Sequence, residues 1–200
     1  MNKFTIYLTL LFSLFACTEA PTLKKLNETD PILAFGDSLT FGYGAPEHQS
    51  YPSVLSELSG LTVINAGING ELSIDGLNRL KSFLDEYKPQ LLLLCHGAND
   101  MLQKKDLSEM SSNLEAMITM AQNREIQVLL IAVPNTNLTL TPIKQYQQVA
   151  QRMGIPLENE LMSEILSQPS LHSDIVHPNA QGYQKMAEAI YQRLLSHGAL

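Results

Sequence analysis

Apolar runs alternate with amphipathic segments along most of the chain. Five short apolar runs predict β-strands: Ile32–Gly36, Leu61–Ala66, Leu91–His96, Gln127–Val133 and a weaker run at Ile155–Leu157. The segments between them carry apolar residues at helical spacing, and they predict helices over His48–Leu58, Ser73–Tyr87, Ser108–Arg124, Pro142–Met153 and Asn179–Ser196. Such alternation is typical of a parallel sheet with helices on both faces. We therefore expect a single α/β domain, a three-layer α/β/α sandwich with about five parallel strands.

Polar and glycine-rich stretches follow several of the predicted strands. The first strand ends in Gly36-Asp37-Ser38, the second runs into NAGING (65–70), and the third into HGAND (96–100). A late loop carries HSDIVHPN (172–179). Ligands of open parallel sheets bind at the carboxyl ends of the strands. We therefore expect these four stretches to meet at one edge of the sheet.

The residues in these stretches match the needs of acyl transfer by a serine. That reaction requires a base for the hydroxyl, a carboxylate that orients the base, and donors for the oxyanion. Ser38 can supply the hydroxyl, while Asp174 and His177, three residues apart, can supply the carboxylate and the base. The backbone N–H groups of Ser38 and Gly70 and the side-chain amide of Asn99 are candidate oxyanion donors. The pattern needs no metal and no cofactor.

Several of these residues have alternative interpretations. Ser38 could serve only as a helix cap, and Asp37 could be a catalytic acid, although we expect Asp37 to hold the turn as a structural acceptor. Asp100 is expected to brace the loop of Asn99. His96 is a rival base, but the sequence shows no carboxylate placed to orient it.

Two further patterns have a second interpretation. His172, Asp174 and His177 have the spacing H-x-D-x-x-H, which also occurs in metal sites. We expect no metal there, because Asp174 and His177 are better explained as a pair. Met101 and Leu102 follow the GAND stretch directly and could form an apolar lip for an acyl chain or simply pack.

Four stretches carry a resemblance to a known family. GDSLT (36–40), the glycine of GING (67–70), GAND (97–100) and DIVHP (174–178) resemble, in order and spacing, the four sequence blocks of the SGNH, or GDSL, hydrolases. The resemblance covers about residues 32–195 and is closest to the short bacterial acyl-thioesterase/lysophospholipase and arylesterase branch. It differs at Ala98, where the family commonly has glycine, and in the loop 133–142, which shows little similarity to that branch.

The resemblance implies a flavodoxin-like fold and a set of roles. Ser38 would be the nucleophile, His177 the base, Asp174 the orienting carboxylate, and Gly70 and Asn99 the oxyanion donors. The implied reaction is hydrolysis of carboxylic esters through an acyl-Ser38 intermediate, with lysophospholipids, thioesters or aryl esters as substrates. A carbohydrate O-acetylesterase is the alternative, since the Asn/Thr-rich loop at Asn135–Thr141 could bind sugar hydroxyls. An envelope scaffold with a decayed hydrolase site is the non-enzymatic alternative.

The first residues have the character of a targeting segment. A lysine near the start is followed by an apolar run over Phe4–Ala16, which is too short to span a bilayer and indicates a signal peptide over residues 1–16. The sequence Leu14-Phe15-Ala16-Cys17 resembles the bacterial lipobox, so Cys17 is the predicted lipidation site. An ordinary secretory signal is the alternative. The polar residues 17–31 predict a tether, which leaves residues 32–200 as the hydrolase domain.

The predicted lipid has consequences for cysteine chemistry and location. Cys95 is the only other cysteine, so a lipidated Cys17 leaves no disulfide in the mature chain. Thr18, rather than aspartate, follows Cys17, which favours the outer membrane in a cell with two membranes. We therefore expect a protein of the bacterial cell envelope, facing the periplasm or the exterior.

Composition limits the class of partner. Two hundred residues with 44% hydrophobic content suffice for one domain with a sizeable core. The net charge is −7 and the chain has no tryptophan, whereas nucleic-acid-binding proteins normally carry a basic face. We expect a monomer whose partners are a small-molecule or lipid ester and, through the anchor, a membrane, but no nucleic acid.

Overall fold

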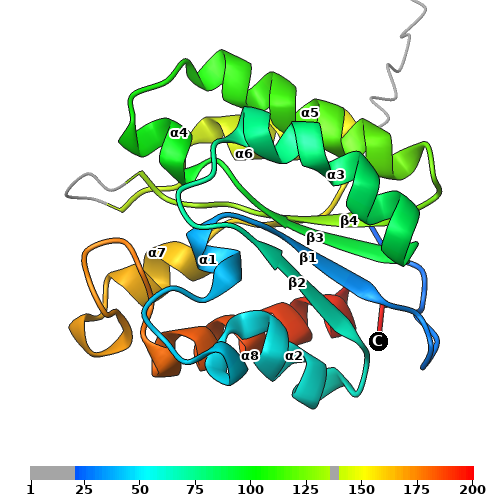
Figure 1. Ribbon diagram of the computed structural model, residues 1–200, viewed down its shortest axis with the longest axis horizontal. Helices are drawn as coiled ribbons and strands as arrows, with labels where there is room; N and C mark the ends of the chain where they lie inside the picture. Colours follow the sequence, from blue (N-terminus) through cyan, green and yellow to red (C-terminus); the bar gives the residue numbers. More distant parts are fainter. Residues whose placement is uncertain (1–20, 136–139) are drawn as a thin grey trace, which may run out of the picture.

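The computed structural model describes residues 21–135 and 140–200. Within them, five parallel strands form one sheet in the order β2-β1-β3-β4-β5 (Figure 1). The strands are β1 (Ile32–Gly36), β2 (Val63–Gly67), β3 (Leu91–Cys95), β4 (Gln127–Ile131) and β5 (Leu157–Glu158). This strand order is that of flavodoxin-like sheets. The predicted fold class is confirmed.

Helices cover both faces of the sheet, as Figure 1 shows. On one face α3 packs against α5, and α5 packs against α6 and α4; on the other, α8 packs against α2 and α7. The elements are α1 (Ser38–Phe41), the 3-10 turn η1 (Glu47–Gln49), α2 (Tyr51–Ser59), α3 (Ser73–Tyr87), α4 (Ala98–Leu102), α5 (Leu107–Gln122), α6 (Lys144–Met153), α7 (Leu161–Leu166), the 3-10 turn η2 (Pro169–Leu171) and α8 (Ala180–Ser196).

The central strands carry the hydrophobic core. Every residue of β1 and β3 is buried, as expected for apolar strands covered on both faces. At the carboxyl end of this pair, Gly36 lies beside Cys95. A Cβ on Gly36 would lie 1.9 Å from the carbonyl oxygen of Cys95, so only glycine allows the two strands to end this close together. The chain turns into α1 from this point.

Some boundaries differ from the prediction. The helix expected over His48–Leu58 is divided into η1 and α2, because Pro52 lacks an N–H and is accommodated at the start of a helix. The second strand begins at Val63 rather than Leu61, and the fifth is shifted to Leu157–Glu158. α1 and α4 were not predicted, because helices of four or five residues are too short to show a helical period.

The segment before β1 packs onto the domain. Leu23 and Leu26 are buried, and their backbone N–H groups donate to the carbonyl oxygens of His197 and Ala199, each at 2.8 Å. The backbone of Lys24 also bonds to the side chain of Gln127, the first residue of β4. The described part of the predicted tether 17–31 is therefore part of the folded domain, because its two leucines bury apolar surface there. Residues 1–16 and Cys17 lie outside the described residues.

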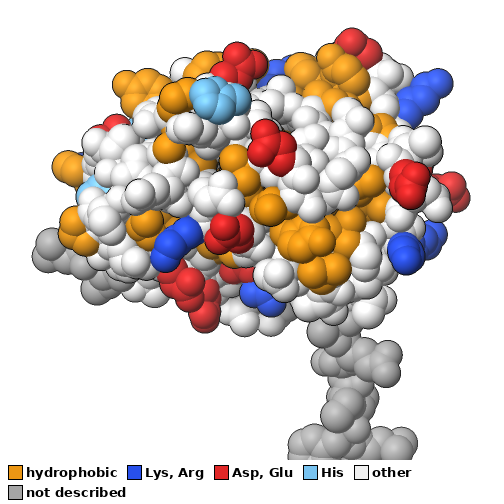
Figure 2. Space-filling model, turned by 90° about the horizontal axis from the view of Figure 1, so that it is seen from below, with side chains coloured by type: hydrophobic (Ala, Val, Ile, Leu, Met, Phe, Trp, Pro, Cys, Tyr) orange, Lys and Arg blue, Asp and Glu red, His pale blue; other side chains and the backbone are white. Residues whose placement is uncertain are grey.

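The surface has a mixed charge pattern. On the face that carries α2 and α8, acidic and basic side chains stand singly among neutral ones, without a broad basic field (Figure 2). Helices long and apolar enough to cross a membrane are absent from residues 21–135 and 140–200.

Candidate active site

Ser38 stands where β1 gives way to α1. Asp37 caps this short helix, since its Oδ1 accepts the backbone N–H of Leu39 at 3.1 Å. Asp37 is fully buried, and burial raises the pKa of its carboxyl group. Its Oδ2 has no hydrogen-bond partner within the described residues. Asp37 thus holds the turn, while Ser38, only 8% exposed, follows it at the edge of the sheet.

The structure brings Ser38, His177 and Asp174 together. His177 Nε2 lies 2.9 Å from Ser38 Oγ, and His177 Nδ1 lies 2.8 Å from Asp174 Oδ2. Because a carboxylate only accepts, Nδ1 carries the proton and donates to Asp174. Nε2 is then free to accept the hydroxyl proton of Ser38. The three residues have the contacts of a hydrolytic triad.

The loop of Asp174 fixes the carboxylate. Its Oδ1 accepts the backbone N–H groups of Val176 and His177, each at 2.9 Å. Burial alone would raise the pKa of Asp174, but the hydrogen bonds from the His177 ring and from these two N–H groups outweigh burial and lower it. Asp174 therefore stays charged at neutral pH. The ring of Tyr43 packs against the ring of His177, with 4.6 Å between centroids.

The predicted oxyanion donors lie on two other loops. Gly70 has a φ of +75°, in the region that favours glycine, and Asn99 lies in α4 directly after β3. One hydrogen of the Asn99 amide is donated to the backbone oxygen of Glu71, at 3.0 Å, which leaves the second hydrogen available. Within the described residues, the N–H groups of Ser38 and Gly70 have no hydrogen-bond acceptor.

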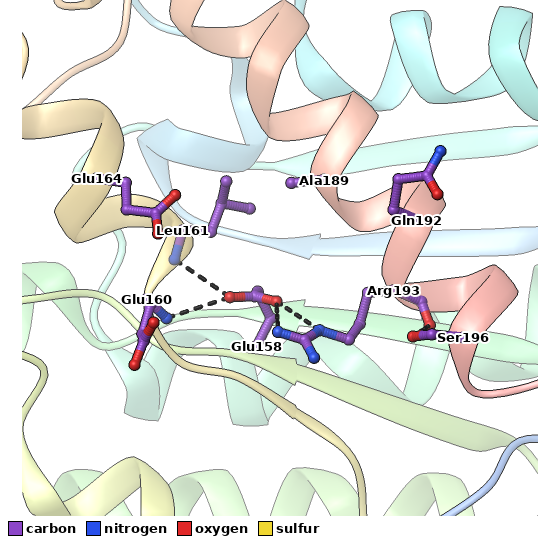
Figure 3. A pocket seen from close by; sticks show the side chains of 8 residues that line it. All are labelled: Glu158, Glu160, Leu161, Glu164, Ala189, Gln192, Arg193 and Ser196. Atoms are coloured by element: carbon purple, nitrogen blue, oxygen red, sulfur yellow. Dashed lines mark hydrogen bonds and ion pairs between the residues drawn. The ribbon is translucent and has the colours of Figure 1, made fainter.

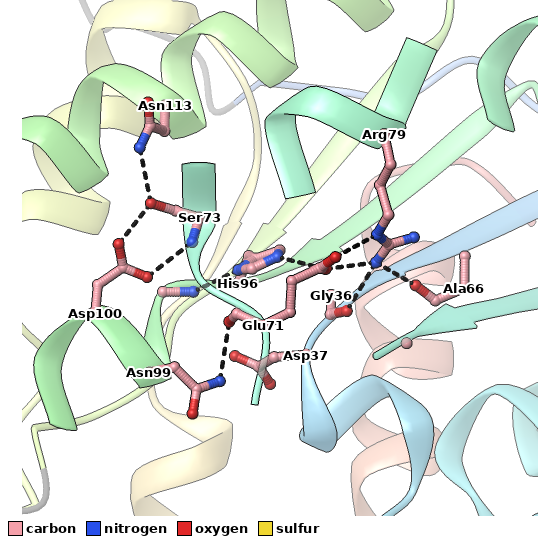
Figure 4. Close-up of polar contacts among 12 residues, drawn as sticks. Gly36, Asp37, Ala66, Glu71, Ser73, Arg79, His96, Asn99, Asp100 and Asn113 are labelled. Carbon is pink, nitrogen blue, oxygen red and sulfur yellow. Dashed lines mark hydrogen bonds and ion pairs between the residues drawn. The ribbon is translucent and has the colours of Figure 1, made fainter. Parts of the chain in front are cut away.

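His96 is excluded as a rival base. Its side chain is fully buried, and Nε2 lies 3.1 Å from Glu71 Oε2. The expectation that no carboxylate is placed to orient His96 is wrong, because Glu71, in the loop between β2 and α3, lies against its ring. The sequence gives no sign of this pairing. Asp100 accepts the N–H and the hydroxyl of Ser73, at 2.9 and 2.6 Å, which ties α4 to the start of α3 (Figure 4).

The structure describes the residues of the candidate metal pattern and those of the predicted apolar lip. Clusters of three or more His, Cys, Asp or Glu side chains suited to a metal ion do not occur in the described part of the chain. The backbone of His172 pairs with that of Pro178 at the base of the loop.

The two residues of the predicted apolar lip differ in exposure. Met101 is half-buried and packs against the core, whereas the side chain of Leu102 is exposed.

A set of exposed apolar side chains lies on the segments that carry the candidate site residues, and of these only Leu102 was predicted from the sequence. They come from the loops that carry the candidate catalytic residues: Phe41, Tyr43, Ile68, Leu102 and Ile175. Ile175 is 81% exposed and lies between Asp174 and His177 in the chain. Their helical or strand periodicity is weak because they lie in loops and short helices. A search for large apolar residues next to the motif residues would have found them.

Comparison with known protein families identifies the family of the chain that carries this site. The model of the GDSL-like lipase/acylhydrolase family matches residues 34–185. The chain belongs to this family. The resemblance inferred from the four motifs is thereby confirmed.

Relatives of this GDSL hydrolase include proteins named as esterases. An arylesterase of Vibrio mimicus is 29% identical over 201 residues, covering 95% of this chain and 96% of the arylesterase. Thioesterase 1/protease 1/lysophospholipase L1 of Escherichia coli K12 is 28% identical over 175 residues, covering 82% and 83%. Among solved structures, the psychrotrophic esterase EstA from Pseudoalteromonas has a TM-score of 0.76 at 26% identity, covering 84% of this chain and 97% of EstA. This GDSL hydrolase is a carboxylic ester hydrolase.

Proposed function

We propose that the protein hydrolyses carboxylic esters through a covalent acyl-Ser38 intermediate. The observation that carries the proposal is the chain of contacts from Ser38 Oγ through His177 to Asp174. His177 Nε2 takes the hydroxyl proton as Ser38 Oγ bonds to the substrate carbonyl carbon. The bond to the alcohol or thiol then breaks, and His177 returns the proton to this leaving group.

The second half of the reaction repeats these steps with water. Water gives a proton to His177 as its oxygen attacks the acyl carbon. The bond from Ser38 Oγ to this carbon breaks, Ser38 recovers the proton, and the carboxylic acid leaves. In both halves, the negative charge on the tetrahedral oxygen is stabilised by the N–H groups of Ser38 and Gly70 and by the amide of Asn99.

Labelling with a fluorophosphonate tests the covalent step. The structural relative EstA is inhibited by monoethylphosphonate. We expect one fluorophosphonate per chain to react, with the adduct on the peptide that contains Ser38, located by mass spectrometry. Prior denaturation provides the control and should abolish labelling, since an unactivated serine is a weak nucleophile. An adduct on another residue of the native protein would refute the assignment of Ser38.

We propose further that the substrate carries a medium or longer acyl chain. The relatives named thioesterase/lysophospholipase support this class, and so does the exposed apolar set at the site. Leu102 lies three residues after Asn99 and Ile175 two residues before His177, and we place the acyl chain along these two exposed side chains. Each methylene that becomes buried adds about 0.8 kcal/mol to binding.

A series of nitrophenyl esters from acetate to octanoate tests the chain-length preference. We expect kcat/KM to rise with chain length, and we expect Ile175→Asn or Leu102→Asn to flatten the rise, because each removes apolar surface at the site. Leu58→Asn is a matched control for Leu102→Asn, since Leu58 is 40% exposed, close to the 45% of Leu102, but lies on α2. Activity that peaks at acetate and falls by butyrate would instead favour the carbohydrate O-acetylesterase. Part of the loop expected to bind sugar, 136–139, lies outside the described residues.

We also propose that Cys17 bears the lipid of a bacterial lipoprotein of the cell envelope. The support is the sequence Leu14-Phe15-Ala16-Cys17 after the apolar run. Cys17→Ser is expected to move the protein from the membrane fraction to the soluble fraction without change in specific activity. Cys95→Ala, which affects the other cysteine, should leave the protein in the membrane fraction. A wild-type protein that is soluble after cell lysis would favour an ordinary secretory signal.

A further inference from the structure

A buried ion pair joins Arg79 to Glu71, the residue that follows the predicted oxyanion donor Gly70. Arg79 Nε donates to Glu71 Oε1 at 2.5 Å, and Arg79 Nη2 donates to Glu71 Oε2 at 2.6 Å (Figure 4). His96 Nε2 lies 3.1 Å from the same Oε2. The side chain of Glu71 is 5% exposed and that of Arg79 16%. A carboxylate is costly to bury, so its two partners are needed to hold it there.

Arg79 attaches this pair to the sheet. Its Nη2 donates to the carbonyl oxygens of Ala66 and Gly36, at 2.8 and 3.2 Å. Its guanidinium also lies over the ring of Phe35, 3.9 Å from the centroid, a cation–π contact. The carbonyl groups belong to the carboxyl ends of β2 and β1. The position of Glu71 is thereby fixed relative to the strand ends that precede Gly70 and Ser38.

His96 connects Glu71 to the helix that carries Asn99. The backbone N–H of Gly97 donates to His96 Nδ1 at 3.0 Å, so Nδ1 bears no proton. Nε2 must then carry the hydrogen and donate it to Glu71. Gly97 is the N-cap of α4, with a φ of +108°. The ring of His96 therefore links the carboxylate of Glu71 to the start of α4.

The backbone of Glu71 contacts the donors themselves. Glu71 follows Gly70 directly, and its carbonyl oxygen accepts the Asn99 amide at 3.0 Å. A carbonyl oxygen only accepts, so this contact determines which end of the Asn99 side chain is nitrogen and turns it toward this loop. A displacement of Glu71 would move both the N–H of Gly70 and the amide of Asn99.

We propose that Glu71, held between Arg79 and His96, is a positioning residue that sets the geometry of the oxyanion hole. It does not touch the substrate. It acts through Gly70 and Asn99, whose donors must be in place before charge develops on the substrate oxygen. This inference rests on the proposed reaction at Ser38.

A second arginine pair with a buried glutamate provides a control away from the site. Arg193 Nε and Nη2 both lie 2.6 Å from Glu158 Oε2, and Glu158 Oε1 accepts the N–H groups of Glu160 and Leu161 (Figure 3). Like Glu71, Glu158 is buried and paired with arginine. The pair lies in a hollow between β5, α7 and α8, and none of the residues lining this hollow belongs to the loops of the active site. Its loss should therefore affect stability but not catalysis.

The test is a double-mutant cycle with Asn99. Glu71→Gln, Arg79→Lys and Asn99→Ala are measured singly, and the first two are also combined with Asn99→Ala. Loss of one oxyanion donor lowers kcat about 10²-fold or more. We expect Asn99→Ala to lower kcat about 10²-fold, and Glu71→Gln or Arg79→Lys about 10-fold, with KM changed less than about 2-fold. Each double variant should lose less kcat than the product of the two single effects, because the part that acts through Asn99 is already lost in Asn99→Ala.

The readouts separate positioning from stability. Each kcat is divided by the fraction of chains that a fluorophosphonate labels at completion, and urea unfolding is measured in parallel. Glu158→Gln and Arg193→Lys should show comparable losses of stability with unchanged kcat. Unchanged kcat per labelled site in Glu71→Gln and Arg79→Lys, or effects that multiply fully with that of Asn99→Ala, would overturn the inference. If either Glu71→Gln or Arg79→Lys does not fold, the kcat of the remaining variant decides whether the inference holds. Absence of labelling at Ser38 in the wild type would refute the proposed reaction instead.

Discussion

Ser38→Ala is expected to abolish hydrolysis of a short nitrophenyl ester. The substitution removes the oxygen that forms the acyl bond and leaves His177 and Asp174 in contact. Serine nucleophiles act as a unit with their base, and their loss lowers kcat by several orders of magnitude. We expect less than about one-thousandth of the wild-type kcat, with the far-UV circular dichroism spectrum and the urea midpoint close to those of the wild type.

Ser111→Ala is the matched control for this change. Ser111 is 8% exposed, like Ser38, and its hydroxyl donates to the carbonyl oxygen of Leu107 at 2.8 Å within α5. Its replacement removes a comparable hydroxyl away from the site and should leave kcat unchanged. Activity of Ser38→Ala above one-tenth of wild type would exclude Ser38 as the nucleophile.

His177→Ala should lower kcat almost as far as Ser38→Ala. Without Nε2, no group at 2.9 Å accepts the Ser38 proton, and the leaving group receives none. Asp174→Ala should be milder, because it removes the charge that orients the ring but leaves the ring itself. Steady-state kinetics on the same nitrophenyl ester measures all three variants.

His172→Ala separates the base from its neighbour in the loop. His172 lies in the same loop, and its backbone pairs with Pro178. Its side chain has no place in the proposed mechanism, so its replacement should leave kcat within about 2-fold. If His172→Ala were as inactive as His177→Ala, the choice of base would be wrong.

The sheet and the four motif loops could be predicted from the sequence for a simple physical reason. The runs LLLLC and QVLLI are apolar at nearly every position, which is the pattern of strands buried on both faces. In a parallel sheet all carboxyl ends lie on one edge, so residues that follow different strands come together without further information. The contacts of Ser38 with His177 and of His177 with Asp174 are in this way a consequence of topology.

The surroundings of the site were not predictable in the same way. Glu71 and Arg79 are ordinary charged residues in sequence, and only the fold shows that both are buried against β1 and β2. Leu23 and Leu26 lie in a polar, proline-bounded stretch, so their burial depends on contacts with His197 and Ala199 at the far end of the chain. Both outcomes depend on long-range packing, which a local pattern does not encode.

The docking of the segment before β1 has a consequence for the direction in which the enzyme faces. The segment lies on the edge where the strands begin, whereas Ser38 follows the end of β1, about 16 Å away along five residues of strand. Only three residues separate Cys17 from Pro21, where the described chain begins, and four Cα–Cα steps span about 14 Å at most. A lipid on Cys17 would therefore hold the strand-start edge close to the bilayer and turn the catalytic edge outward. The enzyme would then draw its esters from the surrounding compartment or an opposing surface, rather than from the leaflet in which it is anchored.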